Sequence, residues 1–139
     1  AAIIAGISVG TLVSLGSALA LAVAMGLTRE QYVTLLPKSV TTAISMDVAA
    51  ELGGIAALTG AIVILTGIAG NLLAETVCKV FHITDPIAKG VGIGTAAHAV
   101  GTSKALQMGE VEGAMSGLSI AVAGVLTAVL CPVFVNFIN

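Results

Sequence analysis

The sequence predicts an all-α integral membrane protein with three full transmembrane helices and two broken or re-entrant half-helix hairpins. Hydrophobic residues make up 58% of the 139 residues and charged residues only 9%, far from the roughly one-quarter charged composition of soluble domains. Uncharged runs at 1–27, 55–74 and 114–138 are each long enough for a helix to cross a hydrocarbon core of about 30 Å. The alternative is a soluble helical bundle, but so few charges would leave most of its surface apolar.

Several classes of function find no support in the residues. The net charge is −2 and no basic patch is present, so nucleic acid is not an expected partner. Cys78 and Cys131 have no ligand spacing and read as small buried hydrophobes. His82 and His98 lack metal-ligand spacing with other donors. We therefore expect no metal, no cofactor and no enzymatic activity, since no nucleophile and base are suitably arranged.

The first uncharged run carries a stripe of small residues. Gly6, Gly10 and Ser14 recur every four residues, which lets another helix approach closely. The run begins directly at the first residue, without the charged region that opens a signal peptide. We therefore expect this chain to be the C-terminal part of a longer protein. Interfacial charges at 28–30 mark the end of the first helix.

Pro37 interrupts the next segment, because it lacks a backbone donor and disfavours helical geometry in the residue before it. A short apolar stretch follows at 43–52, with one acid in its middle, Asp47. Ten residues of helix rise about 15 Å, roughly half a membrane. The polar residues of this first break are Lys38, Ser39, Thr41 and Thr42.

A second broken segment lies between the last two uncharged runs. Asp85 and Pro86 have the form of an N-cap followed by proline at the first helical position. The half-helix that starts there is expected to reach Ala97, where a polar break at 98–103 interrupts it. A short helix resumes at 104–108. The polar residues in and around this break are Thr95, His98, Thr102, Ser103 and Lys104.

The two broken segments indicate an internal repeat within one transmembrane domain, residues 1–139. The units span about 28–80 and 84–139, each with a half-helix, a polar break, a second half-helix and a full span. The repeat is inverted if the broken segments are re-entrant hairpins, which we favour, and parallel if they cross the membrane. Paired interrupted segments are typical of a secondary-transporter binding site.

Two helix starts at mid-membrane, 41–42 and 102–103, would each present a positive end to an anion. Lys38 and Lys104 would add charge beside them, which suits a carboxylate. In the alternative, the lysines reach toward the membrane surface and the hydroxyls bond to their own helices. The predicted substrate-binding residues are Lys38, Ser39, Thr41, Thr42, Thr95, His98, Thr102, Ser103 and Lys104.

His98 and Asp47 are the candidates for coupling transport to an ion. A mid-membrane imidazole either titrates near neutral pH, and so carries a proton, or stays neutral and bonds to a backbone carbonyl. Asp47 is a proton or cation site, or a partner for Lys104, unless it simply faces the interface.

Two long blocks of sequence resemble the LrgB/CidB family of antiholin-like membrane proteins. They are PKSVTTAISMDVAAELGGIAALTG and ITDPIAKGVGIGTAAHAVGTSKALQMGEVEGAMSGL. The resemblance runs from Leu35 to the end of the chain, and family members are longer, with further helices before the first one here. One departure is Ala43, where the family usually has proline after the two threonines.

The resemblance implies two functions. Family members are described as regulators of murein hydrolase export and cell lysis that act with a small LrgA/CidA-like membrane protein. A chloroplast inner-envelope relative translocates glycolate and glycerate, and bacterial relatives are linked to pyruvate uptake. We expect a proton- or cation-coupled monocarboxylate transporter in a bacterial plasma membrane, or in the chloroplast inner envelope of a plant. The lysis regulator is the alternative; expected partners are the bilayer, a small organic acid, the LrgA/CidA-like protein and further copies of this chain.

Overall fold

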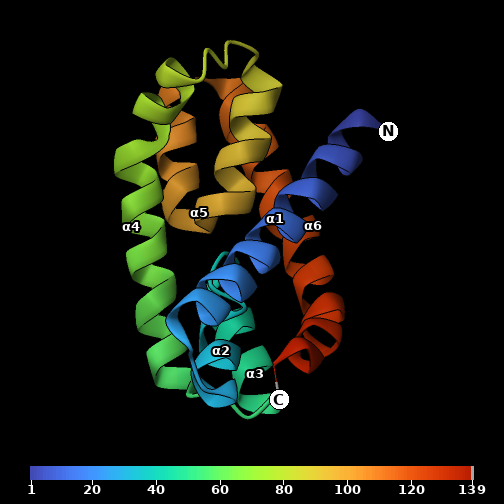
Figure 1. Ribbon diagram of the computed structural model, residues 1–139. Helices are drawn as coiled ribbons and strands as arrows, with labels where there is room; N and C mark the ends of the chain where they lie inside the picture. The colour runs from blue at the N-terminus through green and yellow to red at the C-terminus, as the bar shows by residue number, and fades with distance from the viewer. Residues whose placement is uncertain (139) are drawn as a thin grey trace.

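The structure is a computed structural model that describes residues 1–138, and helices are the only regular secondary structure over those residues. Three long helices frame it: α1 (Ala2–Met25), α4 (Ala56–Val80) and α6 (Glu110–Phe134), which continues into the short 3₁₀ helix η1 (Val135–Phe137) (Figure 1). Each of the three is long and apolar enough to cross a membrane. The predicted all-α membrane architecture with three full spans is therefore confirmed.

The short helices α2 (Arg29–Leu35) and α3 (Thr42–Glu51) form a first hairpin between α1 and α4. A capping box starts α2, in which Thr28 and Gln31 each accept a hydrogen bond from the other's backbone N–H, satisfying two otherwise free donors. The turn follows at Pro37, as predicted. Its carbonyl accepts a 2.7 Å hydrogen bond from the Ser45 hydroxyl, which fastens α3 back onto the turn.

Helix α5 (Pro86–Met108) is itself a hairpin, because its backbone leaves helical geometry at His98, with φ 43° and ψ −139°. Its first arm (86–97) lies against the C-terminal half of α4 and runs toward the middle of the molecule (Figure 1). Its second arm (99–108) lies against the same half of α4 and runs in the opposite direction (Figure 1). Ile93 of one arm and Ala105 of the other consequently lie in one apolar cluster with Ala74 of α4. The break predicted over 98–103 is therefore confined to one residue, His98.

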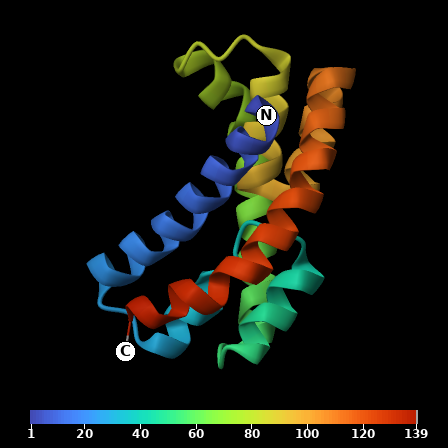
Figure 2. The same cartoon turned by 90° about the vertical axis from the view of Figure 1, so that its right-hand side faces the viewer.

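The two hairpins lie at opposite ends of the molecule. The first sits where α1 ends and α4 begins, and the second where α4 ends and α6 begins, while both turns point toward the middle (Figures 1 and 2). This arrangement agrees with the two broken segments of the sequence. That they form an inverted repeat, with units at about 28–80 and 84–139, stays a prediction, and Asn139 lies outside the described residues.

The first hairpin is anchored to the C-terminal end of α6, whose last carbonyls have no partner within the helix. The Tyr32 hydroxyl donates to the Phe134 carbonyl at 2.8 Å. The Arg29 guanidinium donates to the carbonyls of Val135 and Ile138, at 3.4 and 3.2 Å. Residues of α1, α2, α3 and α6 form the largest apolar cluster around this anchor.

The second hairpin packs most closely on α6. A Cβ atom at Gly94 would lie 2.5 Å from the Ser116 carbonyl oxygen, and one at Gly90 would lie 2.5 Å from that of Glu112. Side-chain-free positions of this kind let membrane helices approach backbone to backbone. The first arm of α5 is therefore held tightly along α6.

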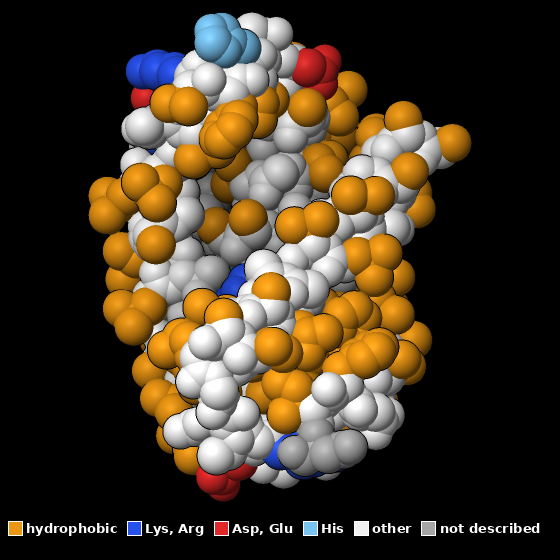
Figure 3. Space-filling model, viewed as in Figure 1, with side chains coloured by type: hydrophobic (Ala, Val, Ile, Leu, Met, Phe, Trp, Pro, Cys, Tyr) orange, Lys and Arg blue, Asp and Glu red, His pale blue; other side chains and the backbone are white. Residues whose placement is uncertain are grey.

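The outer surface agrees with insertion in a membrane. On the face drawn in Figure 3, charged side chains gather at the two ends and apolar ones cover the middle, except for one basic side chain recessed at mid-height. Long apolar residues such as Leu65, Leu72 and Val125 are among the most exposed of the structure. A soluble domain would not present so wide an apolar belt.

Candidate functional site

A cavity of about 300 Å³ lies where the turn of the first hairpin meets α1 and the first arm of α5. We refer to it as the central cavity. It combines residues from three separate parts of the chain, so it exists only in the folded protein. Its polar lining residues are Ser14 and Ser17 of α1, Lys38 and Ser39 of the first turn, and Thr95 of α5.

Among the described residues, Lys38 is the only charged one that lines the central cavity. Its amine donates to the hydroxyl oxygens of Ser39, at 3.1 Å, and Ser14, at 3.4 Å. Within residues 1–138, no carboxylate pairs with it. A partly buried ammonium group with only neutral partners is costly, so an anion in the cavity would supply the missing countercharge.

The two predicted hydroxyl residues in the cavity differ in what they offer an anion. Ser39 is buried and accepts from Lys38, which leaves its own hydrogen free to donate. Thr95 is also buried, but its hydroxyl donates to the Val91 carbonyl of its own helix at 2.9 Å. Thr95 would have to break that bond to donate to a ligand.

Thr41 and Thr42 mark the start of α3, as predicted: Thr41 is the N-cap residue and Thr42 opens the helix. Neither lines the central cavity. They follow Lys38 and Ser39 closely in the chain, so the positive end of α3 lies near the turn. Their contribution to a site would come through the helix end rather than through direct contact.

Lys104 does not line the central cavity but lies beside α4. Its amine lies 2.6 Å from one carboxylate oxygen of Glu75 on α4, and Lys79 pairs with the same carboxylate at 3.7 Å. Asp47, which the sequence offered as a partner, is exposed on α3. The helix of the second arm resumes directly after His98, so Lys104 lies about 9 Å along it from the turn.

The side chains of the remaining predicted residues of the second break are hydrogen-bonded to backbone carbonyls. His98 is 2% exposed, and its Nε2–H donates to the Val63 carbonyl at 2.9 Å. Thr102 donates to the His98 carbonyl at 2.9 Å, and Ser103 to that of Val100 at 2.7 Å. These bonds agree with the alternative to substrate binding, in which the hydroxyls bond to their own helices and the histidine stays neutral and bonds to a backbone carbonyl.

Sequence reasoning did not assign α1 a part in the site. The small-residue stripe signalled a packing face, and the structure shows its partner: Gly10 lies so close to Thr95 that an added Cβ would be 2.6 Å from its hydroxyl oxygen, and Gly6 faces Val91. The same four-residue spacing continues to Ser14, which contacts Lys38. The four-residue period of the stripe was therefore the sequence signal that could have placed Ser14 in the site.

Three apolar spans, two hairpins whose turns point toward the middle of the protein (Figure 1) and a lysine in a central cavity define a helical membrane protein with a polar cavity. The chain belongs to the LrgB-like family, whose sequence profile matches residues 1–137. The resemblance seen in the sequence is thereby confirmed.

Curated relatives of the family carry the name antiholin-like protein LrgB. The chain is 38% identical over 137 residues to those of Bacillus mycoides (strain KBAB4), Bacillus cereus (strain B4264) and Bacillus anthracis (strain CDC 684 / NRRL 3495). Each match covers 99% of this chain and 60% of the relative. No solved structure shows a significant match.

Proposed function

We propose that this chain is part of an antiholin-like protein of a bacterial plasma membrane. In this role the whole protein regulates murein hydrolase export and cell lysis together with a small LrgA/CidA-like membrane partner. The name of the bacterial relatives supports this function more directly than it supports transport. The chain spans 60% of their length, so the role is proposed for the whole protein.

A partner or a further copy of the chain would need a face that the fold leaves open. The small-residue stripe of α1 is already covered by α5 and the first turn. Exposed apolar residues on α4 and α6, such as Leu72 and Val129, remain available within the membrane. The outer face of α1 also exposes apolar side chains, such as Val13 and Val23. We propose association through the exposed faces of these long helices.

A second candidate function is the binding and transport of a small monocarboxylate, favoured by one observation: the partners of Lys38 are all hydroxyls. The cavity volume of about 300 Å³ lies at the small end of ligand sites, which suits an acid of the glycolate, glycerate or pyruvate type. Lys38 would hold the carboxylate, while Ser39 and Ser14 would bind its oxygens.

The proposed coupling residue is His98 in the second turn, two residues after Ala96, which lines the central cavity. Proton uptake there would require the ring to keep donating to Val63 through Nε2 while its other nitrogen takes the proton. Asp47 is exposed on α3, which supports a role at the membrane surface rather than beside Lys38. Lys104 is held by Glu75, so it is left out of the proposed anion site.

Two assays on the full-length protein separate these functions. Proteoliposomes under an imposed pH gradient should accumulate radiolabelled glycolate or pyruvate, with and without the small partner, and Lys38→Met should abolish the uptake. Absence of uptake by the wild-type protein in both conditions would contradict the carrier function.

The second assay measures murein hydrolase activity and lysis in cells that lack the protein. Restoration by the wild type would support the antiholin-like role, and failure to restore would contradict it. Restoration by Lys38→Met as well would show that lysis control does not depend on the anion site.

A further inference from the structure

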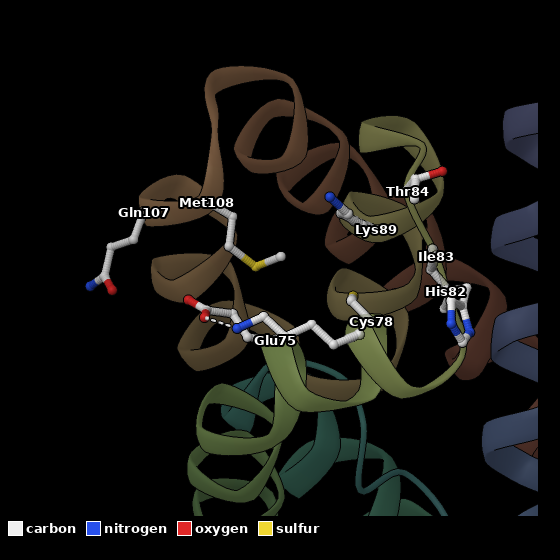
Figure 4. Close-up of a pocket in the computed structure, with 9 residues that line it drawn as sticks. Glu75, Cys78, His82, Ile83, Thr84, Lys89, Gln107 and Met108 are labelled. Carbon is white, nitrogen blue, oxygen red and sulfur yellow. Dashed lines mark ion pairs between the residues drawn. The ribbon is translucent and has the colours of Figure 1, made fainter.

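A second cavity, of about 560 Å³, opens at the end of the molecule where α4 ends and α5 begins (Figure 4). We refer to it as the end cavity. Glu75 and Lys79 reach it from α4, Lys89 from the first arm of α5, and Met108 from the end of the second arm. The neighbouring Phe81 is 70% exposed, as is typical of an aromatic residue at a membrane surface.

Lys89 is the unpaired cation of the end cavity. The carboxylate of Glu75 is already shared by Lys104, at 2.6 Å, and Lys79, at 3.7 Å. Over the described part of the chain, Lys89 makes no ion pair and no side-chain hydrogen bond. The N-terminus of α5 is already capped by the Asp85 carboxylate, which accepts from the Ala88 N–H. The charge that an anionic group could balance at this corner is therefore that of the Lys89 amine itself.

An apolar groove of about 310 Å³ adjoins the end cavity and shares Cys78, Ile83 and Lys89 with it. The groove lies between α4 and the first arm of α5 and reaches as far as Gly70 and Ala97. From Lys89 to the tip of that arm at Ala97 the helix rises about 12 Å. The groove therefore extends from the charged end toward the middle of the spanning helices.

We propose that the end cavity and the apolar groove together bind one anionic phospholipid. Its phosphate contacts Lys89, with Lys79 beside it, and an acyl chain lies in the groove against Leu73 and Ala96. Basic pockets at the end of spanning helices suit anionic head groups. A free phosphate would leave the groove empty, and a zwitterionic lipid would carry its own cation beside Lys89. Gly92 and Ala96 line both the apolar groove and the central cavity, whereas Lys89 lines only the groove and the end cavity. The head-group contact at Lys89 therefore does not depend on either proposed function.

The test is native mass spectrometry of the full-length protein in detergent, titrated with dioleoyl phosphatidylglycerol. We expect one tightly held lipid, weakened by Lys89→Ala about tenfold or more, as for loss of a charge-assisted hydrogen bond. Lys89→Arg should retain binding. Val77→Phe, which fills the groove without lining the central cavity, should also weaken lipid binding. The matched control Val125→Phe, on an exposed part of α6, should not.

Two further ligands distinguish the sources of the phosphate. Dioleoyl phosphatidylcholine tests the charge, and glycerol 3-phosphate tests the need for an acyl chain; both should bind much more weakly than phosphatidylglycerol. Equal binding of the two lipids, or unchanged binding by a folded Lys89→Ala variant, would overturn the proposal. Displacement of the lipid by equimolar glycerol 3-phosphate would assign the site to a free phosphate and would overturn it too.

Discussion

The amine of Lys104 lies 2.6 Å from a carboxylate oxygen of Glu75, so the lysine of the second hairpin is neutralised by α4. Within residues 1–138, the amine of Lys38, the lysine of the first hairpin, donates hydrogen bonds only to the hydroxyl oxygens of Ser14 and Ser39. The two lysines that the sequence treats as equivalent therefore have different roles: Lys104 fastens two helices together, and Lys38 remains available to an anion.

Replacing Lys104 by Ala should leave glycolate or pyruvate binding intact, because Lys104 does not line the central cavity. It should lower the melting temperature of the detergent-solubilised protein, since the ion pair to Glu75 is lost. The charge-reversed pair Lys104→Glu with Glu75→Lys should recover part of that loss. Abolished anion binding by Lys104→Ala without any change in melting would contradict this assignment.

Gly10→Ala should destabilise the protein by about 1–3 kcal/mol, the usual cost of overpacking, because the new Cβ would lie 2.6 Å from the Thr95 hydroxyl oxygen. Gly16→Ala is the matched control on the same helix, since no atom lies within 4 Å of its added Cβ, and it should be neutral or stabilising. Unfolding in mixed micelles measures both. Equal effects of the two changes would show that α1 does not pack on α5 as described.

His98→Gly should be more stable than His98→Ala by about 1 kcal/mol, because Gly adopts positive φ without strain and Ala does not. The reason is the backbone φ of 43° at this residue. In a regular helix the order is the reverse. Both variants lose the bond to Val63. The difference between their free energies of thermal unfolding therefore reports the backbone strain at this residue. Greater stability of the Ala variant would indicate a continuous helix.

Asn71→Ala should destabilise the protein by about 1–2 kcal/mol, as expected for a lost interhelical hydrogen bond in a membrane protein. Its side-chain amide joins α4 to the Val100 carbonyl at 2.9 Å and to the Ser103 hydroxyl at 3.0 Å. The matched control is Asn136→Ala, because the Asn136 amide bonds only to Pro132, four residues earlier. If both substitutions lowered the stability equally, Asn71 would not be the residue that joins α4 to the second arm.

Local chemistry made much of the fold predictable. Uncharged runs located the three long helices, Pro37 located the first turn, and the pair Asp85–Pro86 located the start of α5, where the Asp85 carboxylate accepts from the Ala88 N–H. Each of these signals acts within a few residues, so it can be read without knowledge of the tertiary structure.

The direction of side chains in the second break was not predictable in the same way. Four polar or glycine residues within 98–103, namely His98, Gly101, Thr102 and Ser103, suggested a wide break. One residue with positive φ, His98, suffices for the turn. The helical phase of the second arm depends on that residue, and so does whether Lys104 points to the cavity or to Glu75. The contribution of Ser14 depends on long-range packing of α1, which local patterns do not specify.

The central claim about the site is our proposal that the cavity around Lys38 can bind a small monocarboxylate. The most direct measurement is calorimetric titration of the purified full-length protein with pyruvate, comparing wild type, Lys38→Met and Lys104→Met. The wild type and Lys104→Met should bind pyruvate with similar affinity, and Lys38→Met should show no binding. Wild-type affinity in a folded Lys38→Met variant would contradict the claim.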